Sequence, residues 1–232
     1  MPEPRPTLVL FARAPVPGLV KTRLAPVLAP EGAARLYRAF LEDASRVYVG
    51  PEWSSALYAD PDPDEPSLVA IFGSPWRRES QAEGDLGVRL IGAFKAERSR
   101  GATAVLAVGS DHPALPRQSL RQLFRAVTSG EDAAVIPAQD GGYCAIALSP
   151  RAAPETLFRG IPWSTDATLS VTLDHARRAG LRVAIAEPAY DVDRPADLER
   201  LVTDLASRNP AEEDYPRATA AALARIAPEL LA

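Results

Sequence analysis

Residues 7–23 read TLVLFARAPVPGLVKTR, a short apolar run that leads into a basic segment. The apolar run is rich in Leu, Val and Phe, which is typical of a buried strand. The segment from Arg13 to Arg23 contains three cations and no acidic residue. A surface turn does not require that charge, so this segment predicts a site for an anion.

Apolar runs and amphipathic stretches alternate along the rest of the chain. Residues 30–48 carry apolar side chains at three- and four-residue spacing, which predicts a helix beginning near Pro30. This alternation predicts an α/β fold with a central, mostly parallel mixed sheet and helices on both faces. We expect one domain over residues 1–232, with a C-terminal helical tail from about residue 211.

Composition excludes several classes of protein. The net charge of −4 argues against a nucleic-acid binder that works by bulk electrostatics. The single cysteine, Cys144, excludes an internal disulfide and a zinc site built on cysteines. The N-terminal apolar run is too short for a signal peptide, and no stretch approaches the ~20 apolar residues of a membrane span. We therefore expect a cytoplasmic protein.

The basic segment follows the first predicted strand, and ligands bind at the carboxyl ends of strands in sheets of this kind. Gly18 lets the backbone approach a ligand closely, and Thr22 adds a hydroxyl. Lys21 offers a point charge and Arg23 a planar two-pronged donor, which together suit phosphates. With Arg13, these residues predict a phosphate site. The alternative is a solvated basic loop.

Carboxylates follow two other predicted strands. Asp111 comes two residues after the apolar run that ends at Gly109, where it can hold a hard cation. Asp191 and Asp193 flank one residue, so in an extended backbone they point the same way. Together the three acids predict a magnesium site, because a divalent ion removes the repulsion between facing carboxylates.

Three further motifs suggest substrate contacts. Asp140, Gly141 and Gly142 predict a tight turn before Tyr143, either as a plain hairpin or as the floor of an acceptor pocket with Asp140 as general base. Gln81 and Asp85 precede a predicted helix and either read a nucleobase or cap the helix. Trp163 either stacks on a sugar or base or packs in the core.

Six segments, in this order and spacing, resemble the DUF2064 family of candidate glycosyltransferases. They are LVLFARAPVPGLVKTRLAP (8–26), QAEGDLGVRL (81–90), VGSDHPAL (108–115), PAQDGGYCAIAL (137–148), FRGIPWST (158–165) and DVDRPADL (191–198). The resemblance covers about residues 7–205. The sequence also resembles, more distantly, 2-phospho-L-lactate guanylyltransferase. The shared features are a KTRL-type loop, a strand-terminal Asp and a DGG turn. The sequence departs from the family pattern at His112 and Cys144.

The resemblance implies a Rossmann-like nucleotide-diphospho-sugar transferase fold of the GT-A type. It also implies that Lys21 and Arg23 hold a diphosphate and that Asp111 and Asp193 carry Mg²⁺ or Mn²⁺. We therefore expect a glycosyltransferase that takes a nucleotide-sugar donor and a small-molecule acceptor, with Asp111 and Asp140 as catalytic residues. A nucleotidyltransferase that releases pyrophosphate is the main alternative, and a non-catalytic nucleotide-binding module is a third.

Overall fold

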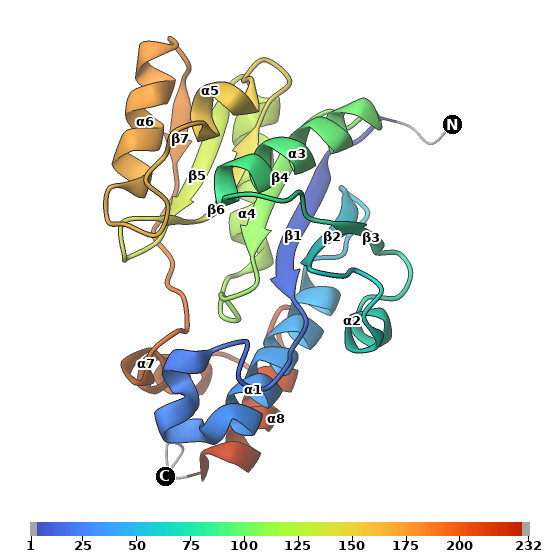
Figure 1. The fold of residues 1–232 in the computed structure, drawn as a ribbon, viewed down its shortest axis with the longest axis vertical. Helices are drawn as coiled ribbons and strands as arrows, with labels where there is room; N and C mark the ends of the chain where they lie inside the picture. The colour runs from blue at the N-terminus through green and yellow to red at the C-terminus, as the bar shows by residue number, and fades with distance from the viewer. Residues whose placement is uncertain (1–3, 229–232) are drawn as a thin grey trace.

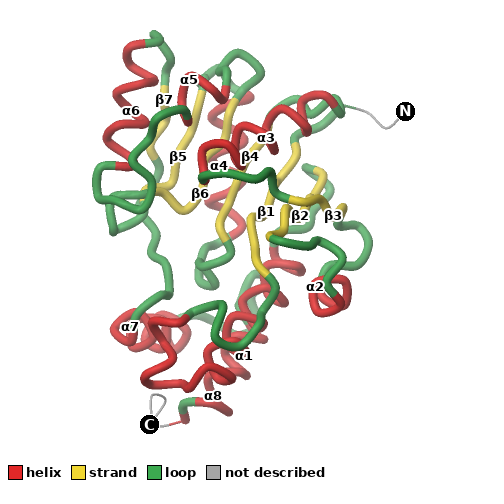
Figure 2. The backbone as a smooth tube through the Cα atoms, in the orientation of Figure 1, coloured by secondary structure: helices red, strands yellow, loops and turns green. Residues whose placement is uncertain are grey.

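Strand β1 (Thr7–Arg13) lies inside a seven-stranded sheet in the computed structural model, which describes residues 4–228 (Figures 1 and 2). The strand order is β3-β2-β1-β4-β6-β5-β7. The other strands are β2 (Ser54–Asp60), β3 (Arg77–Ser80), β4 (Val105–Gly109), β5 (Ala133–Pro137), β6 (Tyr143–Leu148) and β7 (Val183–Ile185). Neighbouring strands pair in parallel except that β6 is antiparallel to both β4 and β5. The predicted fold class, a mostly parallel mixed sheet in an α/β protein, is confirmed.

Helices lie between most successive strands, and two more follow β7. They are α1 (Ala25–Val47), α2 (Pro66–Ile71), α3 (Leu86–Ser99), α4 (Arg117–Thr128), α5 (Pro154–Phe158), α6 (Thr168–Arg178), α7 (Pro195–Ser207) and α8 (Arg217–Ile226), with a short 3₁₀ helix η1 (Thr22–Leu24). No helix in the described part of the chain is apolar over the length that a bilayer crossing needs.

The alternation of side chains along β1 explains why helices cover both faces of the sheet. Successive residues of a strand point to opposite faces. Leu8 and Leu10 belong to an apolar cluster that includes residues of α1, α4, α7 and α8. Val9 belongs to a second cluster formed with residues of α3, α5 and α6. A run that is apolar on both faces is therefore buried on both, as the residues of β1 predict.

Helix α1 contains a break that matches the predicted start. Ala29 has non-helical backbone angles, with φ 55° and ψ 162°, and Pro30 begins the regular segment that follows it. Helix α8 packs against α1, and Leu223 of this helix belongs to the same apolar cluster as β1, as does Ala227 directly after it. The C-terminal region is thus part of the layer that covers one face of the sheet.

The order of the strands determines where a ligand can bind. The chain passes from β1 to β2 on one side, while β4 pairs with β1 on the other. Such a switch opens a crevice beyond the carboxyl ends of the strands. In Figure 1 these ends of β1 and β4 point toward α1 and α7, and Figure 2 shows several loops gathered in that region.

Candidate functional site

A lysine and two aspartates from distant parts of the chain meet at this edge of the sheet. Lys21 Nζ lies 2.5 Å from Asp111 Oδ1 and 2.7 Å from Asp193 Oδ1. The Lys21 side chain is only 3% exposed, whereas the two aspartates are 40% and 38% exposed. We call these residues the Lys21 triad. Its ammonium contacts both carboxylates directly, although the sequence assigns Lys21 to phosphate.

Local structure fixes each member of the triad. Lys21 has left-handed backbone angles, φ 48° and ψ 38°, which cost a non-glycine residue roughly 1 kcal/mol. Asp111 lies two residues beyond the end of β4, and its carbonyl accepts a hydrogen bond from the Val192 N–H. The Asp197 carboxylate accepts hydrogen bonds from the N–H groups of Asp193 and Arg194, at 3.0 and 2.7 Å. Asp197 therefore caps α7 and at the same time holds the backbone of Asp193.

The opposite charges of the triad stabilise one another. Burial disfavours the Lys21 ammonium, but the attraction of Asp111 and Asp193 outweighs that cost and raises the pKa of Lys21 above its usual value. Burial opposes the charge of Asp111 as well. The neighbouring Lys21 ammonium nevertheless holds the pKa of Asp111 below its usual range. Lys21 and Asp111 therefore both carry their charge at neutral pH.

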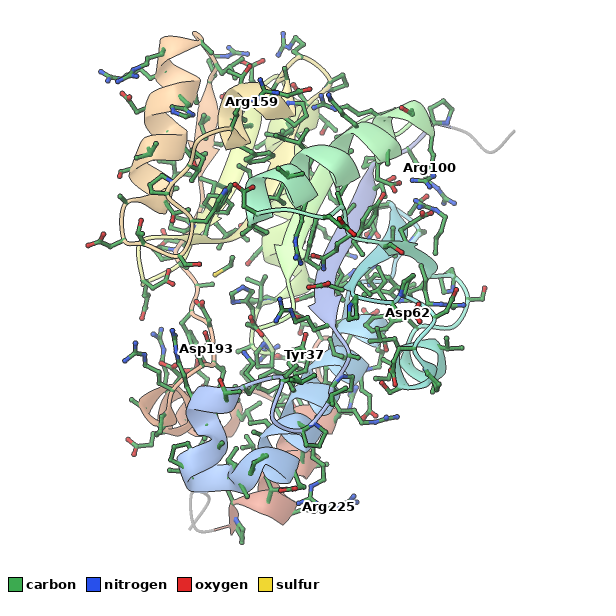
Figure 3. All side chains as sticks on the ribbon, viewed as in Figure 1. Tyr37, Asp62, Arg100, Arg159, Asp193 and Arg225 are labelled. Atoms are coloured by element: carbon green, nitrogen blue, oxygen red, sulfur yellow. The ribbon has the colours of Figure 1, made fainter. Side chains whose placement is uncertain are left out.

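Two cavities meet at the triad. The first has a volume of about 480 Å³ and is lined by the end of β1, the loop before η1 and the start of α3. The second, of about 580 Å³, is lined by η1, the β5–β6 turn and the loop before α6. Both cavities are lined by Lys21, Asp111, Asp193 and Leu86. Figure 3 labels Asp193 and Tyr37, which lie in this region, away from Arg100 and Arg159.

In the first cavity, two predicted residues take part in internal contacts. Arg13 forms an ion pair with Asp60 at 3.2 Å, and its side chain is 60% exposed. The Gln81 amide donates to the carbonyls of Ala12 and Tyr58, and its oxygen accepts from Arg89. Gln81 thus joins the ends of β1 and β2 beneath the cavity.

Asp85 and Gly18 lie outside the residues that line the first cavity. The Asp85 side chain accepts from the Val88 N–H at 2.9 Å, so Asp85 is the N-cap of α3. That result matches the capping alternative for this residue. Gly18 adopts φ 77° in the exposed turn before Lys21, a backbone conformation that favours glycine.

The second cavity gathers most of the residues predicted for an acceptor. Asp140, Gly142, Tyr143 and Trp163 line it together with Thr22 and Arg23 from η1. The rings of Tyr143 and Trp163 pack edge to face, with their centroids 6.2 Å apart. Buried donors normally have a partner, but within the described residues the Trp163 Nε1–H and the Tyr143 hydroxyl have none.

The β5–β6 turn is a tight hairpin turn, and two of its residues also line the second cavity. Asp140 Oδ1 accepts from the Gly142 N–H at 2.9 Å, which closes the turn. Gly141 has φ 90°, and a Cβ there would lie 2.3 Å from the carbonyl oxygen of Asp166. Gly141 is therefore required for close contact with the loop before α6, while Gly142 and Asp140 face the cavity.

The sequence did not single out several residues of the site. The Tyr37 hydroxyl accepts from the Arg13 N–H and lies 2.7 Å from Ser110 Oγ, but its spacing on α1 is that of an ordinary core residue. Arg89 binds Asp60 at 2.7 Å on the wall of the first cavity. In the sequence, Arg89 appears only as a cation in the first turns of a predicted helix, which does not indicate a role in a site.

The family of the chain follows from a match over more than half its length. The model of the family described as "Uncharacterized protein conserved in bacteria (DUF2064)" matches residues 44–165. The chain belongs to the DUF2064 family. None of the curated proteins matches this DUF2064 protein.

Solved structures share the fold of this DUF2064 protein. A candidate nucleotide-diphospho-sugar transferase from Desulfovibrio desulfuricans G20 is 30% identical, with a TM-score of 0.87 over 99% of this chain and 97% of that one. A cytidylyltransferase from Leptospira borgpetersenii serovar Hardjo-bovis is 9% identical, with a TM-score of 0.59 over 99% and 97%. A manganese complex of Rv0371c from Mycobacterium tuberculosis H37Rv is 18% identical, with a TM-score of 0.52 over 85% and 97%. The last two likenesses concern the fold alone.

Proposed function

We propose that this DUF2064 protein is a metal-dependent glycosyltransferase that moves a sugar from a nucleotide-diphospho-sugar to a small-molecule acceptor. The observation that carries the proposal is the position of the Lys21 triad between two cavities at the carboxyl edge of the sheet. A transferase needs two substrates whose reacting ends meet at one charged centre. The likeness to the Desulfovibrio protein supports a nucleotide-sugar as the donor.

The first cavity is the proposed donor site. Its volume of about 480 Å³ lies within the range of small-molecule sites, roughly 300–1,000 Å³. The nucleoside would lie over the end of β1, with Arg13, Gln81 and Arg89 on the walls. The diphosphate would extend toward Lys21 and Arg23. Arg23 is exposed, and the described residues contain no acidic partner for it within ion-pair distance, so its fork is available to phosphate oxygens.

The site fits a hard divalent cation. Asp111 and Asp193 lie 2.5 and 2.7 Å from the same Lys21 Nζ, so their carboxylates are close enough together to share one cation. Carboxylate oxygens are the ligands that Mg²⁺ and Mn²⁺ prefer. We propose Asp111 and Asp193 as the residues that hold the ion, with Asp191 as a nearby carboxylate. When bound, such an ion neutralises charge on the leaving diphosphate.

The second cavity is the proposed acceptor site. Asp140 lies on its wall with one carboxylate oxygen committed to the Gly142 N–H, which leaves the other for an acceptor hydroxyl. In that position it would act as the general base. Tyr143 and Trp163 also line this cavity and would shape the acceptor pocket. In the reaction, the acceptor oxygen bonds to the sugar C1, the C1–O bond breaks, and a nucleoside diphosphate leaves.

Nucleotidyl transfer is the second candidate, because a nucleoside triphosphate would meet the same charged groups at the Lys21 triad. The same phosphate and cation groups would serve, but the acceptor would attack the α-phosphorus of a nucleoside triphosphate and pyrophosphate would leave. Incubation with a panel of nucleotide-sugars and nucleoside triphosphates, each with Mn²⁺, separates the two reactions by the product released. Nucleoside diphosphate from a nucleotide-sugar supports glycosyl transfer, and pyrophosphate supports the alternative.

Variants make this experiment specific to the proposed centre. Asp111→Asn and Asp193→Asn should each abolish turnover, because they remove proposed cation ligands. Asp174→Asn is a matched control, since Asp174 lies on α6 and pairs with Arg177 and Arg178 outside both cavities. Turnover that survives both active-site changes would overturn the proposal, and nucleotide binding without any turnover would favour a non-catalytic module.

A further inference from the structure

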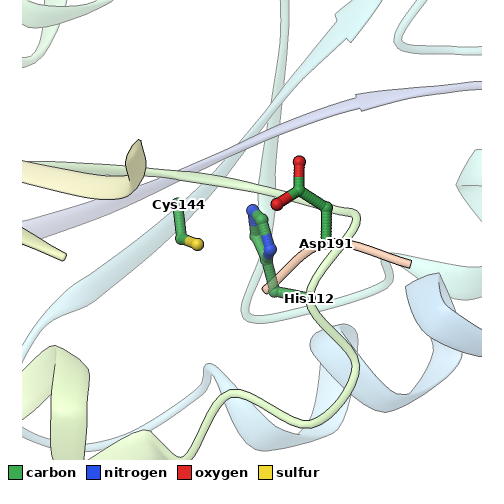
Figure 4. A group of neighbouring side chains, drawn as sticks. All are labelled: His112, Cys144 and Asp191. Atoms are coloured by element: carbon green, nitrogen blue, oxygen red, sulfur yellow. The ribbon is translucent and has the colours of Figure 1, made fainter. Parts of the chain in front are cut away.

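A histidine, a cysteine and an aspartate converge beside the second cavity (Figure 4). One ligating atom from each of His112, Cys144 and Asp191 lies within 4.8 Å of the others. His112 and Cys144 are buried, and Asp191 is half-buried. These side chains come from the loop after β4, from β6 and from the segment before α7, so the fold itself brings them together.

The histidine is oriented as a metal ligand would be. His112 Nδ1 lies 3.2 Å from the carbonyl oxygen of Tyr190, and this contact assigns the ring proton to Nδ1. The lone pair of Nε2 is then available for a cation, and a backbone carbonyl on the other nitrogen is the usual outer partner of a metal-bound histidine. A Cβ at Gly109 would lie 3.2 Å from Nε2, so the glycine leaves room beside this atom.

The surroundings of the cluster favour a cation. The Asp191 carboxylate is half-buried, and Asp140 and Asp193 line the same cavity, so negative charge gathers there. The Cys144 thiol is buried. The thiol has a weak partner, the Pro137 carbonyl at 3.8 Å. A divalent ion would stabilise both anionic forms.

We propose that His112 Nε2, Cys144 Sγ and the Asp191 carboxylate bind a divalent cation of the zinc type, at a site separate from the Asp111–Asp193 pair. Thiolate and imidazole select zinc over magnesium, and composition excludes only zinc sites built on cysteines. Ligand atoms around tetrahedral zinc lie roughly 3.3–3.8 Å apart, given its bond lengths, so the side chains would move inward by about 1 Å. Binding converts the Cys144 S–H to a thiolate bonded to the ion and releases one proton to solvent.

Three protein ligands leave a fourth position, which is the pattern of a catalytic rather than a structural zinc site. His112 and Asp191 line the second cavity, so the open position faces the space proposed for the acceptor. A hydroxyl or thiol bound there would lose its proton more readily. The metal binding does not depend on the proposed transferase activity; the activation of an acceptor at the open position rests on it.

Titration with Co²⁺, followed by competition with Zn²⁺, tests the site in the intact chain. Cys144 is the only cysteine, so a thiolate-to-cobalt charge-transfer band in the near ultraviolet can come from no other residue. We expect that band at one equivalent of Co²⁺, its loss when Zn²⁺ is added, and no loss in excess Mg²⁺. Zn²⁺ binding should release about one thiol proton per chain.

Variants assign the ligands. Cys144→Ser should abolish the band, and the loss of Zn²⁺ affinity from this change should exceed the ~10–100-fold that loss of an outer partner costs. His112→Gln should weaken Zn²⁺ binding similarly, whereas His175→Gln, which removes the only other histidine, should leave it unchanged. Asp111→Asn should keep the cobalt band even where it abolishes transferase turnover, which separates this inference from the proposed function.

Two results would overturn the inference: wild-type protein without a thiolate band, or equal Zn²⁺ affinity in wild type and Cys144→Ser. If the serine variant fails to fold, which circular dichroism shows, the wild-type cobalt spectrum alone decides.

Discussion

Replacement of Lys21 by methionine removes the ammonium of the triad and keeps nearly the same chain length. Lys21 is 3% exposed, and its ammonium is within 2.7 Å of both carboxylates. Removing one partner of a buried ion pair costs about 3–5 kcal/mol. Asp111 and Asp193 are 40% and 38% exposed, so water stabilises them once the ammonium is gone. We therefore expect a loss of about 2 kcal/mol in the free energy of unfolding.

Urea denaturation at neutral pH measures this loss, and the melting temperature should fall by about 4–8 °C for a chain of this size. Lys95→Met is the matched control, since Lys95 is the only other lysine. Lys95 pairs with Glu155 and is 58% exposed, so its removal should cost less than about 1 kcal/mol.

The loss of unfolding free energy in the Lys21→Met variant should depend on pH. The pKa of Asp111 is lowered in the folded protein, so its stabilising contribution is present above the unfolded pKa, near pH 4, and is lost as pH falls through the folded pKa. The pKa of Lys21 is raised, so its contribution is present below the unfolded pKa and is lost as pH rises through the folded value. The difference between wild type and variant should therefore be largest between these limits. A difference below about 0.5 kcal/mol at neutral pH, or one that persists unchanged in acid, would refute the electrostatic reasoning.

Three further changes test other parts of the site. Asp197→Ala should cost about 1 kcal/mol by removing the cap of α7, and it should weaken donor binding in calorimetry because the backbone of Asp193 is no longer held. Gly141→Ala should destabilise the fold by clearly more than Gly160→Ala in the same urea assay. Both glycines have positive φ, but only at Gly141 does a Cβ meet backbone atoms, so equal effects would contradict the packing described for this turn. Arg23→Ala should weaken donor binding by about 10–100-fold with little change in stability, whereas the exposed Arg125 on α4 should tolerate the same change without loss of affinity.

Much of the fold follows from the sequence because the central strands are buried on both faces and read as continuous apolar runs. The exceptions have physical reasons. Strand β3 is a short edge strand, and its residues, RRES, carry charges that form ion pairs with Glu97 and Asp64 instead of an apolar pattern. Helix α5 spans only Pro154–Phe158, which is too short to show helical periodicity.

The site is partly predictable for a related reason. The carboxyl ends of parallel strands share one edge, so basic and acidic clusters that follow separate strands can be expected to meet there. Which side chain contacts which, however, cannot be predicted from the sequence in this way. The contact of Lys21 with both aspartates depends on a left-handed backbone at that residue, and the use of Gln81 to join two strands depends on carbonyls outside its own segment.

The most direct test of the proposed donor site is a crystal structure with a nucleotide-sugar and Mn²⁺, with the ion located by its anomalous scattering. We predict an anomalous peak within bonding distance of Asp111 and Asp193, with the diphosphate beside Lys21 and Arg23 and the nucleoside over the end of β1. A nucleotide bound elsewhere on the protein, or an ion that contacts neither aspartate, would contradict the proposal.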